Sequence, residues 1–264
     1  PCMLPKFVIP TCATLLVSIS FSVSASAETG RLPAGVTPLA YDITVAPDAT
    51  KLAFTGEETI TIEVAVPTPV LTLNAADLAI GSAVLDGAVK ATVKIDESSQ
   101  TASFTFAQPV AKGRHTLKLS YSGKINRSAA GLFAVDYKGV DGKDARLLVT
   151  QFEAPDARRF APMWDEPALK ATFRLSALAP TGQMAFSNMP VASKEETAGG
   201  TLWHFAETPK MSSYLLFLGM GHVDRKTVMA GGTEIGIITR KGAVDQGDYS
   251  LASAQKLLAY FNDY

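Results

Sequence analysis

The sequence has almost no cysteine and no concentration of basic charge. Both cysteines, Cys2 and Cys12, lie within its first twelve residues. A chain processed after that segment has no thiol, which excludes disulfides, thiolate catalysis and thiolate metal ligands. The 24 Lys and Arg balance 25 Asp and Glu and are scattered, so no basic stripe exists to neutralise phosphates. We therefore expect no nucleic-acid partner.

Histidine is equally scarce. The three histidines are His115, His204 and His222, and none is followed by Glu or by a second His at helical spacing. A zinc site of the H-E-x-x-H type needs two His on one helix face with a Glu between them. We expect structural or surface roles for all three and no metal ligand in this chain.

The composition is that of a folded globular protein. The 264 residues are 47% hydrophobic and 19% charged, which is enough apolar material for a large core and argues against disorder. We find no internal repeat, and no low-complexity segment after the first residues. The chain is long enough for one large domain or two small ones.

The first 27 residues have the pattern of a signal peptide. Lys6 precedes an apolar run over residues 7–23, and Ala25, Ser26 and Ala27 are small residues of the kind that signal peptidase reads. We expect cleavage after Ala27, a periplasmic or secreted mature protein, and no stable membrane anchor. The alternative is an uncleaved segment that anchors the chain, for which a run of about 17 residues is marginal.

From residue 39 onward the chain reads as a succession of short strands. Apolar residues alternate with polar ones, which is typical of half-buried strands, and turn-forming residues separate the runs. The expected strands cover residues 39–45, 60–66, 93–95, 104–106, 117–121, 146–152, 172–177, 201–205, 214–218 and 234–239. Many short strands without intervening helices predict a mostly β fold, an antiparallel sandwich or a pair of packed sheets.

The last twenty residues change character. Five apolar residues share the three-and-four spacing of an amphipathic helix: Leu251, Ala254, Leu257, Leu258 and Phe261. The pattern is still running at Tyr264 without a stop signal. An apolar stripe with nothing after it to cover it leads us to expect that this helix begins a missing domain.

One polar pair stands out near the middle of the chain. Phe152 is expected in the core at a strand end, with Gln151 and Glu153 on the opposite face. From the pattern alone, two polar side chains that flank a buried aromatic residue are usually the solvated side of an edge strand. The residues by themselves therefore leave a binding role open.

A dense group of charges follows this pair. Arg158, Arg159, Asp165 and Glu166 lie in an expected loop. Such a cluster is more often a structural ion-pair network than a site, and exposed pairs of this kind contribute about 0–1 kcal/mol.

The two stretches together resemble the signature of the aminopeptidase N family of gluzincin-type zinc metallopeptidases. The signature here is T-Q-F-E-A-P-D-A-R-R over residues 150–159 and P-M-W-D-E-P-A-L-K-A-T-F over residues 162–173. Further pieces agree in the family's order: L-N-A (73–75), Y-S-G (121–123), G-L-F (131–133), S-N-M-P (187–190), T-P-K-M-S-S-Y-L (208–215) and Y-F-N-D-Y (260–264). Met163 stands where the family has Cys, and Ser213 where Thr is common. The resemblance runs from about Arg31 to the end.

The resemblance implies a division of the chain and a role for the polar pair. Residues 28–241 are expected to form the family's amino-terminal saddle of β-sheets, and residues 242–264 the start of its α-helical peptidase domain. Glu153 is implied to pair with the α-ammonium of a peptide substrate, and Gln151 to line the pocket for the first side chain. An α-amino group has a pKa of about 7.7–8.0 and is largely cationic at neutral pH, so a carboxylate can hold it.

The resemblance therefore implies an exported zinc aminopeptidase that removes single residues from peptides with a free amino terminus. Zinc is implied for the full-length enzyme only, because this chain has neither H-E-x-x-H nor the family's G-x-M-E-N segment. We expect the fragment alone to be inactive and to work with the missing catalytic domain of the same protein. The alternative is a non-catalytic secreted β-sandwich binding module derived from that family.

Overall fold

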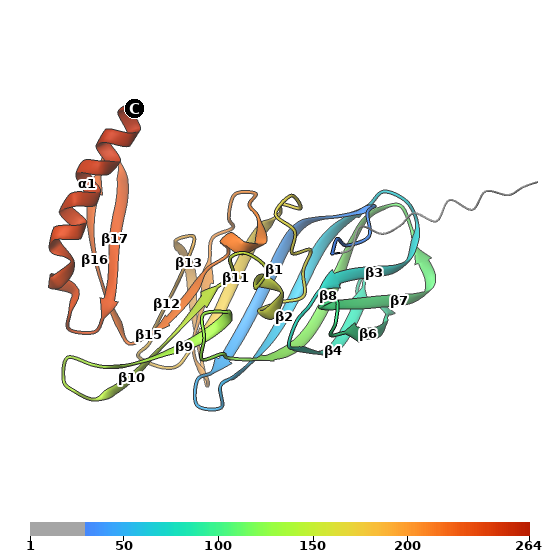
Figure 1. Ribbon diagram of the computed structural model, residues 1–264, viewed down its shortest axis with the longest axis horizontal. Coiled ribbons are helices and arrows are strands. Elements are labelled where there is room, and N and C mark those ends of the chain that lie inside the picture. Colours follow the sequence, from blue (N-terminus) through green and yellow to red (C-terminus); the bar gives the residue numbers. More distant parts are fainter. Residues whose placement is uncertain (1–29) are drawn as a thin grey trace, which may run out of the picture.

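A computed structural model of the protein describes residues 30–264, and the predicted signal peptide lies outside these residues. The described part is built mainly from strands (Figure 1). The strands are β1 (Val36–Asp48), β2 (Ala53–Val64), β3 (Thr68–Asn74), β4 (Leu78–Leu85), β5 (Val89–Lys90), β6 (Thr92–Asp96), β7 (Thr101–Val110), β8 (Gly113–Lys124), β9 (Gly131–Lys138), β10 (Asp144–Gln151), β11 (Thr172–Ala179), β12 (Met184–Ser187), β13 (Val191–Thr197), β14 (Gly200–Phe205), β15 (Leu218–Gly221), β16 (Val223–Ala230) and β17 (Thr233–Arg240). The helical elements are the short 3₁₀ segments η1 (Ala157–Arg159), η2 (Ser213–Leu215) and η3 (Val244–Gly247), and the helix α1 (Asp248–Asp263).

The largest layer is an eight-stranded sheet in the order β13-β14-β11-β1-β2-β8-β4-β5. Its neighbours pair antiparallel except β1 and β11, which run parallel. Alternation sets its two faces: Tyr41, Ile43 and Val45 of β1 are buried, whereas Asp42 and Thr44 between them are exposed. A slip of one residue would turn every apolar side chain of β1 to water, so this register is strongly specified. The mostly β prediction is confirmed.

A three-stranded sheet, in the order β3-β7-β6, forms a second layer. Its buried residues, among them Leu71, Leu73 and Phe104, belong to the same hydrophobic cluster as the inner face of the large sheet. Burying each such side chain stabilises the fold by about 1.5–3 kcal/mol relative to leaving it exposed. The core therefore lies between these layers.

A four-stranded sheet, in the order β12-β15-β10-β9, continues the molecule along its long axis (Figure 1). Strand β10 pairs with β9 along its whole length, from Asp144 opposite Lys138 to Gln151 opposite Gly131. The expected strand over residues 214–218 is wrong in position, because Ser213–Leu215 forms η2 and the strand begins at Leu218. Backbone N–H groups of residues 215 and 216 bond back three residues there, which closes 3₁₀ turns instead of a ladder.

The β16–β17 hairpin and α1 form a separate unit at one end of the molecule (Figure 1). The predicted helix is confirmed, and Leu251 is its buried residue. Four of its large hydrophobic side chains are exposed, as is Tyr264 directly after the helix; the four are Tyr249, Leu257, Tyr260 and Phe261. The division at residues 241 and 242 stays a prediction.

Candidate functional site

The end of β10 presents two polar side chains on either side of a buried phenylalanine. Phe152 is 2% exposed and its ring lies 5.3 Å from that of Phe160, whereas Gln151 and Glu153 are both exposed. The ring of Phe160 in turn lies 5.9 Å from that of Phe54 on β2. Phe152 thus fixes the chain to the core at the point where both polar side chains turn outward, as the alternation predicted.

Glu153 opens a tight turn. The N–H of Asp156 donates to the carbonyl of Phe152 at 2.9 Å, the Glu153–Ala154 peptide bond is cis, and η1 follows directly. Within residues 30–264 the carboxylate of Glu153 has no hydrogen-bond or ion-pair partner, and the same is true of the amide of Gln151. The arrangement therefore offers a solvent-facing carboxylate on a fixed turn beside an uncommitted amide. Such a carboxylate can hold a cationic group.

The charges that follow form a structural network, as expected, but its central pair is buried. The Nε of Arg158 lies 2.9 Å from Oδ2 of Asp165, and these side chains are 15% and 1% exposed. Arg159 pairs with Asp156 at 2.7 Å. Glu166 accepts a backbone N–H from the amino-terminal segment at 2.7 Å. The expectation of a weak exposed pair is therefore wrong for Arg158 and Asp165, because breaking a buried pair costs far more than breaking a surface one.

The structure also contains a buried acid that the sequence reading missed. Glu58 on β2 is 1% exposed, and neither of its carboxylate oxygens has a partner within residues 30–264. Burial raises the pKa of this carboxyl well above its usual value. The strand alternation could have predicted this burial, because Glu58 lies two and four residues before Ile60 and Ile62, whose side chains face the core.

The three histidines lie in different parts of the fold. On β8, Nδ1 of His115 lies 2.7 Å from a carboxylate oxygen of Asp86, and this hydrogen bond raises the pKa of His115. On β14, Nδ1 of His204 lies 2.8 Å from the hydroxyl of Ser176. His222 separates β15 from β16. Within residues 30–264, no group of three His, Cys, Asp or Glu side chains is placed to hold a metal ion. The described residues do not fit the zinc that the resemblance implies for the full-length enzyme.

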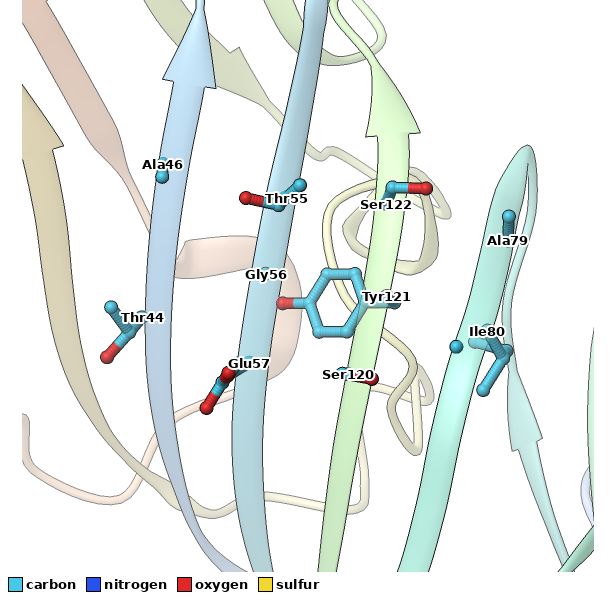
Figure 2. A pocket seen from close by; sticks show the side chains of 11 residues that line it. Thr44, Ala46, Thr55, Gly56, Glu57, Ala79, Ile80, Ser120, Tyr121 and Ser122 are labelled. Atoms are coloured by element: carbon cyan, nitrogen blue, oxygen red, sulfur yellow. The ribbon is translucent and has the colours of Figure 1, made fainter.

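A pocket of about 510 Å³ opens on the outer face of the large sheet (Figure 2). Hydroxyl groups of Thr44, Thr55, Ser120 and Ser122 line it. Figure 2 shows the ring of Tyr121 lying across β2 beside Gly56, where a Cβ would come within 2.3 Å of the ring. Neither Gln151 nor Glu153 lines this pocket, so it is separate from the candidate site.

Comparison with known proteins assigns the chain to a family. The structure defines a mostly β domain that carries an exposed carboxylate, that of Glu153, on a turn. The family model described as the Peptidase M1 N-terminal domain matches residues 37–215. The chain therefore belongs to the peptidase M1 family, as its amino-terminal domain.

Relatives of the chain are named as aminopeptidases. It is 41% identical over 263 residues to an aminopeptidase N of Acetobacter pasteurianus, covering 96% of this chain and 74% of that one. It is 37% identical to an aminopeptidase M1-B of Oryza sativa subsp. japonica and 31% identical to an endoplasmic reticulum aminopeptidase 1 of Rattus norvegicus. The chain spans 27% and 26% of the length of these last two relatives. Among residues 30–264, no helix is both long enough and apolar enough to cross a bilayer.

Proposed function

We propose that this chain is the substrate-anchoring domain of an exported zinc aminopeptidase. The observation that carries the proposal is the free carboxylate of Glu153, fixed on a turn at the end of β10, in a chain whose relatives are aminopeptidases. Peptides with a free amino terminus are the substrates, and the enzyme removes their first residue. The zinc ligands and the general base are supplied by a catalytic domain outside the described residues, so the described residues alone are inactive.

Glu153 holds the α-ammonium of the substrate. An exopeptidase must measure distance from a charged terminus. Once the catalytic domain encloses it in a water-poor cleft, the carboxylate rejects an internal peptide bond, which brings no charge to offset the desolvation of the carboxylate. Gln151 lines the pocket for the first side chain, where its amide can donate and accept hydrogen bonds. Both residues bind and orient the substrate, and the described residues carry out no bond breaking.

The test is the kinetics of the complete aminopeptidase with Glu153→Gln, which keeps the shape and removes the charge. A hydrogen bond to a charged group is worth about 1.5–3 kcal/mol, and each 1.4 kcal/mol corresponds to a factor of ten. We expect KM for aminoacyl arylamides to rise about tenfold to a hundredfold. Glu57→Gln is the matched control, because Glu57 is exposed on the outer face of the large sheet. An unchanged KM in Glu153→Gln would refute the role of Glu153.

The second candidate is a non-catalytic binding module with the family's fold. The discriminating feature is the ammonium anchor itself, because a module without exopeptidase chemistry has no need of a carboxylate aimed at a free amino terminus. The complete protein should hydrolyse aminoacyl arylamides and leave their N-acetylated forms intact. A complete protein that hydrolyses neither would favour the binding module.

A further inference from the structure

The guanidinium of Arg158 is bound on several sides. Its Nε lies 2.9 Å from Oδ2 of Asp165, its Nη2 donates to the carbonyl of Asp165 at 3.2 Å, and its Nη1 donates to Oε1 of Gln100 at 3.4 Å. The backbone N–H of Arg158 also donates to Oδ2 of Asp165, at 3.2 Å. A planar guanidinium, whose donors are fixed in one plane, can make these bonds at once, whereas the ammonium of a lysine cannot reproduce this arrangement.

Asp165 carries the same network to two further segments. Its other carboxylate oxygen accepts a hydrogen bond from the hydroxyl of Ser213 in η2, at 2.5 Å. Its backbone N–H donates to Oδ1 of Asn74 at the end of β3, at 3.1 Å. Arg158, Asp165, Ser213 and Asn74 thus join four separate segments. We refer to the Arg158–Asp165 pair, with Ser213, as the clasp.

The clasp lies one short turn from Glu153. On one side of that turn Phe152 is buried against Phe160, and on the other side Arg158 is held by Asp165. Between these two fixed points, residues 153–155 are exposed, Asp156 is half-buried and Ala157 is buried, and all five lie outside the sheets. The position of the Glu153 carboxylate therefore depends on how firmly both ends of the turn are held.

We propose that Arg158 and Asp165 are positioning residues that set where Glu153 meets the α-ammonium of the substrate. The proposal rests on the proposed function of Glu153. Loosening the clasp lets the turn shift, which weakens the contact between Glu153 and the α-ammonium, a contact to a charged group that is worth about tenfold or more in affinity. Because the affected contact is one made to the bound substrate, the loss falls on KM and leaves kcat largely unchanged.

The test compares three variants of the complete aminopeptidase. Arg158→Lys keeps the positive charge but removes the planar set of guanidinium donors. Ser213→Ala removes the hydrogen bond from the Ser213 hydroxyl to Asp165. Arg174→Lys is the matched control, since Arg174 also bridges two carboxylates, Asp42 at 3.1 Å and Glu207 at 2.9 Å, but on the outer face of the large sheet. We expect KM to rise about tenfold in Arg158→Lys, at the lower end of the effect of Glu153→Gln, and by a smaller factor in Ser213→Ala. KM should stay at the wild-type value in Arg174→Lys.

A double variant separates positioning from a general loss of stability. If the clasp acts through Glu153, KM of Arg158→Lys combined with Glu153→Gln equals that of Glu153→Gln alone, because the second change removes a contact already lost. Multiplying effects in the double variant would overturn the proposal. The proposal would also be overturned if Arg158→Lys and Ser213→Ala both kept the wild-type KM while Glu153→Gln raised it. In that case the proposed function of Glu153 would stand. A wild-type KM in Glu153→Gln would overturn both. Where Arg158→Lys does not fold, Ser213→Ala and its double variant carry the same test.

Discussion

Glu58 lies at the centre of the core-facing side of the large sheet. It is directly opposite Ile43 on β1 and Leu119 on β8. The ionisable groups near it are the phenols of Tyr41 and Tyr121, both buried. An ionised carboxylate there would have no partner within the described residues, so burial favours the neutral acid and raises its pKa.

This predicts a stability that falls as the pH rises. Since the folded-state pKa of Glu58 lies above its usual 4.5, its contribution is fully present below that value and is lost as the pH rises toward the folded pKa. The slope for one proton is about 1.4 kcal/mol per pH unit. Glu58→Gln, neutral at every pH, should unfold at a higher temperature than wild type at pH 8, with the difference shrinking toward pH 4.5. Thermal unfolding at several pH values measures this.

Glu57→Gln is the control for Glu58→Gln. Glu57 is the preceding residue, faces the opposite side of the sheet and pairs with Lys118 at 3.5 Å in solvent. Its substitution should leave the pH profile of unfolding unchanged. A Glu58→Gln profile parallel to that of wild type from pH 4.5 to 8 would show that Glu58 is not held neutral in the folded protein.

For single residues, the sequence predicted burial correctly where apolar and polar side chains alternate regularly along a strand. The burial of Phe152 and the exposure of its neighbours follow from alternation, because one face of β10 must face the core. The role of Glu153 came from resemblance, since no periodicity distinguishes a ligand-binding carboxylate from a solvated one. The buried pair of Arg158 and Asp165 was read as exposed because loop geometry, which no local pattern encodes, decides its burial.

Among the elements, the hairpin and helix at the carboxyl-terminal side depend on few contacts. Leu251 is 4% exposed, whereas Leu257 on the same helix is 55% exposed. The helix is also tied to the hairpin by Lys226, whose Nζ lies 3.1 Å from Asp245 and 2.7 Å from Asp248. These ion pairs are solvent-exposed and weak. The side-chain amide of Gln255 also donates to the carbonyl of Met229 at 3.0 Å. Leu251 is the one buried residue of the helix, and we infer that it contributes most to the docking.

Leu251→Ala should therefore release α1 without unfolding the sheets. Truncating a buried Leu costs about 2–5 kcal/mol. A loss of this size is enough to detach a helix whose docking depends mainly on one buried side chain. Hydrogen exchange should show faster exchange over residues 248–263 and unchanged protection in β1, β2 and β8. Leu257→Ala is the matched control and should leave the exchange of the helix as it is. Equal exchange in wild type and Leu251→Ala would contradict this account of the docking.

Element prediction from sequence succeeded where one face of a strand is buried. Strands β1, β2 and β8 alternate clearly and were expected. Strand β13 was missed because all seven of its residues are exposed, which leaves no alternation to read. The parallel pairing of β1 with β11 was not foreseen either, because residues 40–45 pair with residues 172–177, far along the chain, and a local pattern carries no partner information.

The whole molecule combines a β-rich body with a small unit of hairpin and helix (Figure 1). Membership of the peptidase M1 family rests on most of the body, residues 37–215. The order of the short motifs predicted this membership, whereas the layering of the sheets had to come from the structure. In our account the body holds the amino terminus of a peptide, and a further domain carries out its hydrolysis.

The most direct test of that account is to read the source gene past the codon for Tyr264. The account predicts an in-frame H-E-x-x-H segment within a few hundred codons, followed by a further Glu that completes the zinc ligands. Finding both would supply the catalytic half that the described residues do not contain. A stop codon directly after Tyr264 would contradict the aminopeptidase proposal and leave the β-sandwich binding module as the function.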